Sequence, residues 1–254
     1  MSSIDEQMLR MLAEAKSRAH PPISNFFVGA IALGASGALY PGANFEVPGN
    51  PLNQTVHAEQ SAVANAFSKR EKGLVALAVT HAPCGHCRQF LNEINGASGL
   101  RIVIQGQPAR TLAELLPASF GPQDLGNTTG MLDSAPAQLR LASDSEDELS
   151  RAALQAASRA YAPYSKSPSG CAIAMKSGHV YAGSYLENAA FNPSLSPLQV
   201  AIVNAVLASE DIATIQRVVL VEMKNATISQ LAPTKTVLEA IAPHAKLEVK
   251  ASVA

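Results

Sequence analysis

The sequence is poor in cysteine, because its 254 residues include only Cys84, Cys87 and Cys171. So few cysteines cannot build the disulfide framework that stabilises many small secreted proteins. We therefore expect a reducing compartment. Two of the three cysteines, Cys84 and Cys87, lie close enough in the chain to belong to one site.

Charge is also scarce. Charged residues make up 15% of the chain, and the formal net charge is -1. Nucleic-acid binding takes most of its affinity from phosphates that Lys and Arg neutralise, so this balance predicts no nucleic-acid partner. Hydrophobic residues amount to 47%, which is typical of a globular chain.

Long hydrophobic runs are missing as well. No uninterrupted apolar segment reaches the length needed to cross a membrane, so we expect no membrane partner. The first 20 residues place Asp5, Glu6 and Glu14 within a helical pattern of apolar residues, which is typical of neither a secretory signal nor a transit peptide. These features predict a cytoplasmic protein.

The most informative segments are HAE at 57–59 and PCGHC at 83–87. One histidine and two cysteines supply three zinc ligands and leave the fourth tetrahedral position open for water, as catalytic zinc sites do. A carboxylate two residues beyond the histidine can take the proton of that water. We expect one zinc ion per chain on His57, Cys84 and Cys87, with Glu59 as the catalytic residue.

Both motifs are predicted to begin helices, over 56–68 and 84–95. Cys84 and Cys87 are three residues apart and so share one helical face. The unpaired N–H groups and the positive dipole end of a helix favour thiolates there.

Three other interpretations are weaker. A redox dithiol has no use for an upstream His-x-Glu. A structural zinc site needs a fourth protein ligand, and His86, between the two cysteines, should point away from their shared face. Glu59 as a solvated surface charge is disfavoured by its place next to a ligand.

The chain also contains an internal repeat. Residues 24–46 align without gaps on 165–187, and after a two-residue deletion 57–66 align on 196–205. A repeat of this length implies two copies of one domain fold.

The second copy lacks the chemistry of the first. Ser196 stands at the position of His57, Leu198 at that of Glu59, and no Cys-x-x-Cys follows the apolar run at 217–226. We expect a catalytic domain at 1–125, a linker rich in Gly, Pro, Ser and Asp at 126–147, and a non-catalytic scaffold domain at 148–254.

Each copy predicts α/β architecture, a three-layer αβα domain with a mixed sheet. Two β-rich runs joined by a Ser-Gly turn precede a helix and a buried strand, and the first copy adds a second helix and a strand at 100–105. The first hairpin should be antiparallel, and strands joined through helices can be parallel. Strand order does not follow from this pattern.

The His-x-Glu and Pro-Cys-x-x-Cys pair is a signature of zinc-dependent nucleobase deaminases. More of the chain resembles the large two-domain homodimeric type of the cytidine/deoxycytidylate deaminase family. The segments that carry this resemblance are SNFFVGA (24–30), GANFE (42–46), QTVHAEQSA (54–62), APCGHCRQF (82–90), SFGP (119–122), PYSKSPSG (163–170) and ENAAFNPSLSPLQ (187–199). Phe27 departs from it, because a polar residue stands there in the relative we compare.

The resemblance implies roles for further residues. Asn44 and Glu46 would bond the ribose hydroxyl, Phe26 would stack on the base, and Phe120 would reach into the neighbouring subunit's site. The expected substrate-binding set is Asn44, Phe45, Glu46, Phe26, Ala58 and Phe120. Without the resemblance, Asn44 could be a turn residue, and Phe26 or Phe27 could be a core residue, because adjacent strand positions face opposite sides.

The implied reaction is hydrolytic deamination of cytidine and 2'-deoxycytidine to uridine and 2'-deoxyuridine with release of ammonia, as in pyrimidine salvage. The alternative is a related zinc deaminase that acts on a cytosine nucleotide or polynucleotide, or on a nucleoside antibiotic. The negative charge of Glu46 would repel a phosphate, which favours a nucleoside. A non-catalytic zinc scaffold is disfavoured by an intact Glu59 beside intact ligands.

Overall fold

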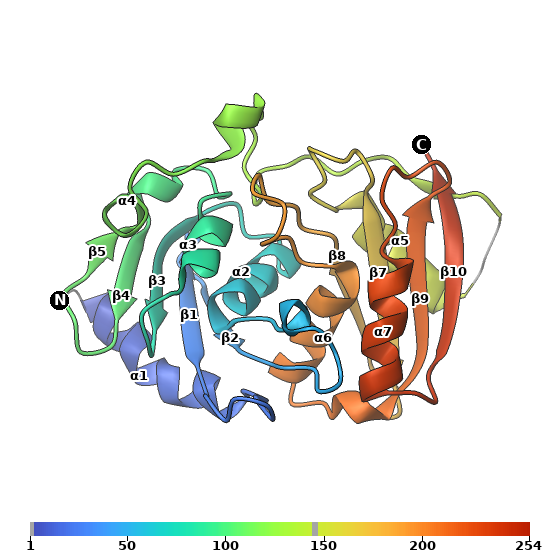
Figure 1. The fold of residues 1–254 in the computed structure, drawn as a ribbon, viewed down its shortest axis with the longest axis horizontal. Helices are drawn as coiled ribbons and strands as arrows, with labels where there is room; N and C mark the ends of the chain where they lie inside the picture. The colour runs from blue at the N-terminus through green and yellow to red at the C-terminus, as the bar shows by residue number, and fades with distance from the viewer. Residues whose placement is uncertain (1–2, 144–146) are drawn as a thin grey trace. The chain divides into compact units, whose positions relative to one another are not determined.

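The computed structural model describes residues 3–143 and 147–254, so the expected linker at 126–147 includes residues 144–146 that lie outside the described part (Figure 1). The chain forms two compact units. The first unit runs to Glu46 and continues through Thr55–Asp133 and Asn188–Pro193. The second unit consists of Val47–Gln54, Ser134–Glu187 and Ser194–Ala254. The domain boundaries that we expect from the sequence stay a prediction.

The first unit is built on a sheet in the order β2-β1-β3-β4-β5. The β1–β2 hairpin is antiparallel and β3 pairs parallel with β4, as the sequence predicts. The elements are α1 (Ser3–Ser17), β1 (Gly29–Gly34), β2 (Leu39–Ala43), α2 (Ala58–Ser68), β3 (Leu74–Val79), α3 (Gly85–Leu91), β4 (Arg101–Ile104), β5 (Arg110–Thr111) and α4 (Leu112–Leu115), with 3-10 turns at Ala97–Gly99 and Pro122–Leu125.

Helices α1 and α2 cover opposite faces of this sheet. A Cβ on Gly29 would lie 2.7 Å from Leu12 O of α1, whereas a Cβ on Gly42 would lie 2.3 Å from Ala58 O of α2. Gly42 pairs with Ala30, the neighbour of Gly29, and adjacent residues of a strand face opposite sides. The arrangement is therefore a three-layer αβα sandwich, and both helices approach the sheet closely because glycine has no side chain there.

The second unit repeats this plan with a sheet in the order β6-β10-β9-β7-β8, in which β9 and β10 are parallel. Its elements are β6 (Arg140–Leu141), α5 (Glu148–Ser158), β7 (Ser169–Met175), β8 (Val180–Ser184), α6 (Pro197–Leu207), β9 (Ile215–Met223), α7 (Leu231–Ile241) and β10 (Lys246–Val253), with 3-10 turns at Leu52–Gln54 and Ile212–Thr214.

The duplication extends to individual contacts. A Cβ on Gly170 would lie 2.3 Å from Ala153 O of α5, and one on Gly183 would lie 2.3 Å from Pro197 O of α6. These are the counterparts of the two close approaches in the first unit. The repeat that the sequence shows from residue 24 onward therefore also includes the preceding helices α1 and α5.

Two sequence-based expectations differ from the structure. A second helix and strand were expected in the first copy only, but α7 and β10 give the second copy the same pair. The sequence pattern does not reveal this pair, because Pro233 lies in the first turn of α7, and polar residues alternate with apolar ones in β10, where Ser252 is the one buried residue. The helix predicted over 84–95 ends at Leu91.

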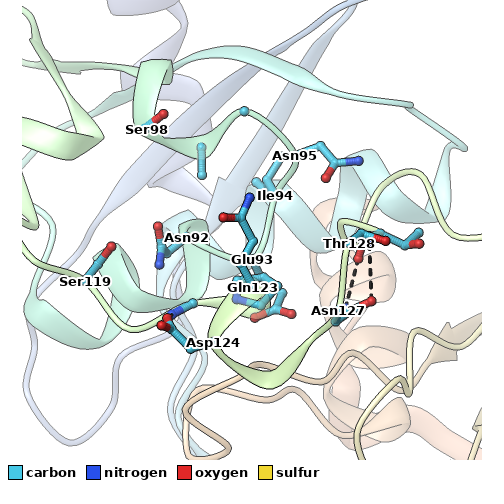
Figure 2. Close-up of a pocket in the computed structure, with 15 residues that line it drawn as sticks. Asn92, Glu93, Ile94, Asn95, Ser98, Ser119, Gln123, Asp124, Asn127 and Thr128 are labelled. Carbon is cyan, nitrogen blue, oxygen red and sulfur yellow. Dashed lines mark hydrogen bonds between the residues drawn. The ribbon is translucent and has the colours of Figure 1, made fainter.

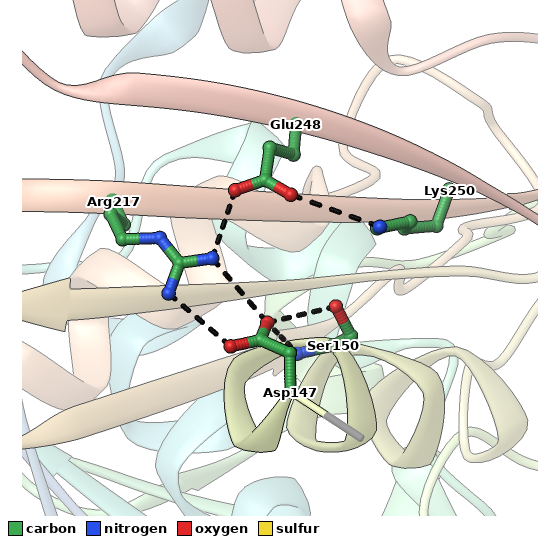
Figure 3. Close-up of polar contacts among 5 residues, drawn as sticks. All are labelled: Asp147, Ser150, Arg217, Glu248 and Lys250. Carbon is green, nitrogen blue, oxygen red and sulfur yellow. Dashed lines mark hydrogen bonds and ion pairs between the residues drawn. The ribbon is translucent and has the colours of Figure 1, made fainter. Parts of the chain in front are cut away.

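A polar network fixes the start of α5 in the second unit (Figure 3). Asp147 caps the helix by accepting a hydrogen bond from Ser150 N, and it also pairs with Arg217 of β9 at 3.2 Å. Arg217 pairs with Glu248 of β10 at 2.8 Å, and Lys250 lies 3.8 Å from the same carboxylate. The network therefore joins the first turn of α5 to two strands.

No helix among the described residues combines the length and the apolar character that a membrane span requires.

Two corresponding segments change places between the units. Residues 47–54 follow the first copy's hairpin but belong to the second unit, whereas 188–193 follow the second copy's hairpin but belong to the first. Gln60 Nε2 of α2 donates to Pro193 O at 3.1 Å, and Gln199 Nε2 of α6 donates to Gln54 O at 3.1 Å. Each unit thus contains the segment encoded in the other copy.

Candidate active site

The two motif segments lie at helix N-termini, as predicted. His57 is the N-cap of α2 and its N–H donates to Gln60 Oε1, while Cys84 is the N-cap of α3 and its Sγ accepts from Cys87 N at 3.5 Å. The caps place His57, Cys84 and Cys87 where the positive ends of two helix dipoles stabilise negative charge.

The three side chains form the only group of at least three His, Cys, Asp or Glu residues in the described part of the chain that could hold a metal ion. His57 Nδ1 lies 3.2 Å from Cys87 Sγ and 3.5 Å from Cys84 Sγ, and the two sulfurs are 3.6 Å apart. Tetrahedral zinc with sulfur and nitrogen ligands separates them by roughly 3.5–3.8 Å. The geometry therefore fits zinc with one position left open.

His86 does not belong to this group. Its Nε2 lies 3.3 Å from Gln60 Nε2, and its ring centroid is 6.0 Å from that of His57. The side chain is turned toward α2, so His86 adds no fourth ligand atom to the group that could hold a metal ion.

The electrostatics of the site favour a thiolate and a carboxyl group that holds a proton. Hydrogen bonds with Cys87 and His57 lower the pKa of Cys84 to about 3. The pKa of Cys87 is raised, first by its hydrogen bond to Cys84 and then by burial. Burial raises the pKa of Glu59, which is 4% exposed and hydrogen-bonded to Cys87. A carboxyl group in this environment can both accept and return a proton.

A cavity of about 400 Å³ opens beside these groups. Its lining contains seven of the residues expected from the sequence, namely Phe26, Asn44, Glu46, His57, Ala58, Glu59 and Cys84. Phe45 is fully buried, because its side chain faces the opposite side from those of its neighbours Asn44 and Glu46. Its backbone forms β-bridges with His20 and Val56. Phe120 is 47% exposed and lies outside this lining.

Asn44 and Glu46 hold the loop that carries Phe26. Asn44 Oδ1 accepts from Val28 N at 2.8 Å, and its Nδ2 donates to Phe26 O at 2.9 Å. Glu46 accepts hydrogen bonds from Ile23 N and from both Ser24 N and Ser24 Oγ. Burial would raise the pKa of Glu46, but the bonds from Ser24 and Ile23 outweigh it and lower that pKa. Glu46 therefore remains a carboxylate at the cavity wall.

A family model described as the cytidine and deoxycytidylate deaminase zinc-binding region matches residues 2–101, and a second model of the same description matches residues 112–235. The chain belongs to this deaminase family.

Relatives match over nearly the whole chain. The cytidine deaminase of Aliivibrio fischeri is 49% identical over 243 residues, which cover 96% of this chain and 81% of the relative. The cytidine deaminase of Vibrio cholerae is 46% identical over 249 residues, which cover 97% and 84%. The solved cytidine deaminase from Mycobacterium tuberculosis is 35% identical and covers 46% of this chain and 96% of its own, with a TM-score of 0.42.

The second copy retains the loop anchor of this deaminase fold without the metal ligands. Glu187, the counterpart of Glu46, accepts hydrogen bonds from Tyr164 N and Ser165 N, which correspond to Ile23 and Ser24. Anchoring this loop is therefore a property that both copies share. Glu46 performs it whether or not it also contacts a substrate.

The positions of His57, Glu59 and Asn44 are occupied in the second copy by residues that cap a helix or lie buried. Ser196 caps α6 by accepting from Gln199 N, and Leu198 is 1% exposed. Tyr185 stands where Asn44 stands. Burial raises its pKa to about 12, and its side chain is hydrogen-bonded to Ser194 and Gln230. A buried phenol thus takes the place of a polar cavity wall.

Sequence reasoning gave no role to five residues that line the cavity. Four of them lie within the segments that carry the family resemblance, namely Ser24, Val28, Thr55 and Ala82. The fifth, His81, lies outside all of those segments. The available signal was position, because residues just beyond the end of β3 and just before the Cys motif must lie beside that motif.

A second cavity, of about 310 Å³, lies in the first unit (Figure 2). Its lining is dominated by amide and hydroxyl side chains, among them Asn92, Asn95, Gln123 and Asn127, with the carboxylates of Glu93 and Asp124. It contains neither the three possible ligands nor a cysteine or histidine. Ser119 and Gly121 from its wall flank Phe120, whose carbonyl accepts hydrogen bonds from Gln89 and Asn92.

Proposed function

We propose that the chain hydrolyses the exocyclic amine of cytidine and 2'-deoxycytidine, which yields uridine or 2'-deoxyuridine and ammonia, in pyrimidine salvage. The observation that carries this proposal is a buried Glu59 beside three side chains that could hold a metal ion, at a cavity lined by Glu59 and by two of the three, His57 and Cys84. Relatives called cytidine deaminase, 46–49% identical over nearly the whole chain, support the choice of substrate.

His57, Cys84 and Cys87 would hold the zinc ion of the family. Their mutual distances of 3.2–3.6 Å and their mixed nitrogen and sulfur donors suit that metal. When bound, zinc supplies an activated water as the nucleophile near neutral pH.

Glu59 moves the protons of the reaction. Its carboxylate takes a proton from the attacking water and gives it to N3 of the base, so that C4 can accept the new oxygen. It then takes the remaining proton from the new hydroxyl on C4 and gives it to the exocyclic amine, so that the C4–N bond breaks, the C4 carbonyl forms and ammonia leaves. Burial raises the pKa of Glu59, which favours the protonated form that can deliver the proton.

The cavity suits a nucleoside better than a nucleotide. Phe26 offers an aromatic face for cytosine, and Asn44 and Glu46 retain acceptor and donor capacity for sugar hydroxyls. No Lys or Arg stands among the described residues that line it, and Glu46 is negative. A phosphate group would meet a like charge there without a cation to balance it.

We further propose a homodimer with shared sites in a cytoplasmic setting. Phe120 is an exposed aromatic residue outside the cavity of its own unit, which suits a role in the cavity of a second chain. The second copy, at 148–254, would be non-catalytic, with the catalytic domain at 1–125 and the linker at 126–147. Ser196 and Leu198 at the ligand and carboxylate positions support that division.

The test measures zinc content and turnover of cytidine, cytidine monophosphate and a cytosine-containing oligonucleotide with the purified chain. We expect one zinc per chain and ammonia release from cytidine, with much slower release from the other two. Two zinc ions per chain would refute an inactive second copy. Faster turnover of the nucleotide or oligonucleotide would refute the substrate.

A further inference from the structure

His81 contacts the aromatic ring that the proposed function assigns to the base. Its ring centroid lies 4.6 Å from that of Phe26, with an angle of 52° between the ring planes. This separation and tilt fall in the range of favourable aromatic pairs. Both rings line the same cavity. His81 is exposed and lies two residues beyond the end of β3.

The imidazole is attached to the sheet and not to the loop. His81 Nδ1 lies 3.1 Å from Thr80 Oγ1, and that hydroxyl oxygen accepts from Gly29 N, at the start of β1, at 3.2 Å. Thr80 and Gly29 are also joined through their backbones, because Thr80 N donates to Gly29 O. The ring of His81 therefore has a rigid support next to the loop.

The hydrogen bonds of the loop hold its backbone and leave the Phe26 ring to other contacts. Asn44 bonds the carbonyl of Phe26, and Ser24 Oγ accepts from Phe26 N at 3.1 Å. The side chain of Phe26 is itself 52% exposed. A half-exposed ring changes rotamer readily on the picosecond to nanosecond timescale, so a neighbouring ring that favours one orientation changes its population.

The second copy shows what replaces this pair where the ligands are missing. Ser167 stands at the position of Phe26, is 2% exposed, and accepts a hydrogen bond from Thr227 N at 2.9 Å. Glu222 corresponds to His81 in the sheet, because Ala30 pairs with Val79 and its counterpart Cys171 pairs with Leu220. Glu222 accepts from Ser229 Oγ at 3.1 Å. There, two polar side chains bind the segment 227–229. The pair of rings thus accompanies the copy with the ligand set.

We propose that His81 is a positioning residue for the deaminase reaction, because its ring holds Phe26 in the orientation that receives the cytosine ring. This inference rests on the proposed function. It assigns the effect to the ring of His81 as a packing surface and gives its protonation no part. Substrate affinity should therefore depend on a flat side chain at position 81, whereas the chemical step at Glu59 should not.

The experiment compares three variants of the full-length zinc-loaded protein. His81→Ala should raise the KM for cytidine and the Kd for the product uridine, measured by calorimetry, by about 2- to 10-fold, with kcat and zinc content unchanged. His81→Phe should restore both values and keep the wild-type dependence of kcat/KM on pH. His179→Ala is the matched control, because His179 is an exposed histidine whose ring lies 6.3 Å from Tyr181 in the second unit.

The outcomes distinguish the positioning role of His81 from the proposed function. If the wild type deaminates cytidine but His81→Ala leaves KM and Kd unchanged, the positioning role is refuted and the proposed function stands. If His81→Phe behaves like His81→Ala and changes the pH profile, the imidazole acts through its nitrogen atoms and the packing role is refuted. If the wild type releases no ammonia from cytidine, the proposed function fails and the inference fails with it.

Discussion

Glu59 is buried and hydrogen-bonded to Cys87, one of the three candidate zinc ligands. A substitution there can therefore test the proton transfer separately from metal binding. Glu59→Gln keeps the shape and a hydrogen-bonding group but cannot transfer a proton. We expect unchanged zinc content and a loss of kcat of at least about 10²–10⁴-fold, the typical contribution of general acid–base catalysis. Steady-state turnover of cytidine with parallel metal analysis measures both. Turnover near that of the wild type with zinc retained would mean that the protons travel by another route.

The cysteines give a second prediction at this scale. Cys84→Ala or Cys87→Ala should release zinc and lower the thermal stability of the first unit, because metal-binding energy is also folding energy. Cys171→Ala is the matched control, since Cys171 is a fully buried cysteine of the second unit, and it should keep its zinc. Metal analysis and a thermal melt of each variant make the comparison. Full zinc content in Cys84→Ala would show that the ligand set is wrong.

Single residues differ in how far the sequence reveals them. The spacing of His57, Cys84 and Cys87 predicts a cluster, and the structure brings their ligand atoms within 4.8 Å of one another. Spacing says nothing about the partners of a side chain. It therefore could not show that Asn44 and Glu46 first bond a backbone loop, or that the ring of His81 meets that of Phe26.

Among the elements, α2 packs closely against β2 because Gly42 of β2 has no side chain. A Cβ on Gly42 would come within 2.3 Å of both Ala58 O and Ala62 N, which are backbone atoms and cannot rotate away. Gly42→Ala should therefore displace α2, lower the free energy of unfolding by about 1–3 kcal/mol, and reduce kcat, because His57 is the N-cap of α2 and Glu59 lies in its first turn.

Gly183→Ala is the matched control for this prediction. It makes the same approach, 2.3 Å from Pro197 O and from Ala201 N of α6, in the second unit. Denaturant unfolding should show a similar loss of stability, while kcat at a temperature where the protein stays folded should be retained. An equal loss of kcat in both variants would contradict a non-catalytic second copy.

The elements that the sequence reveals best are those whose pattern is buried on both sides. All residues of β1 are buried, and the repeat of its neighbourhood marks β7 as its counterpart. By contrast, seven of the eight residues of β10 are exposed or partly buried, and α7 has Pro233 in its first turn. Their assignment depends on pairing between β9 and β10, which is a long-range contact that no local pattern records.

The prediction about Phe120 concerns the whole molecule, because it requires a second chain. If its ring completes the site of a second chain, Phe120→Ala should weaken substrate binding and leave zinc content unchanged. A mixed dimer of Phe120→Ala with Glu59→Gln then has one site with both lesions and one site with neither, as two-fold symmetry requires. We expect mixing of the two inactive or weakened parents to restore the activity of about one site per dimer.

Mass spectrometry of the intact assembly confirms subunit exchange in that experiment, and the unmixed parents are its controls. Activity no greater than the mean of the parents, despite confirmed exchange, would place Phe120 in its own chain and contradict a shared site.

The two segments that change units, 47–54 and 188–193, also bear on the history of the gene. They occupy equivalent places in the repeat, and the glutamines Gln60 and Gln199 hold them in equivalent ways. An ancestor with one copy could complete its unit in this manner only with a segment from another polypeptide. The duplication would then have joined, in one reading frame, two polypeptides that already exchanged this segment.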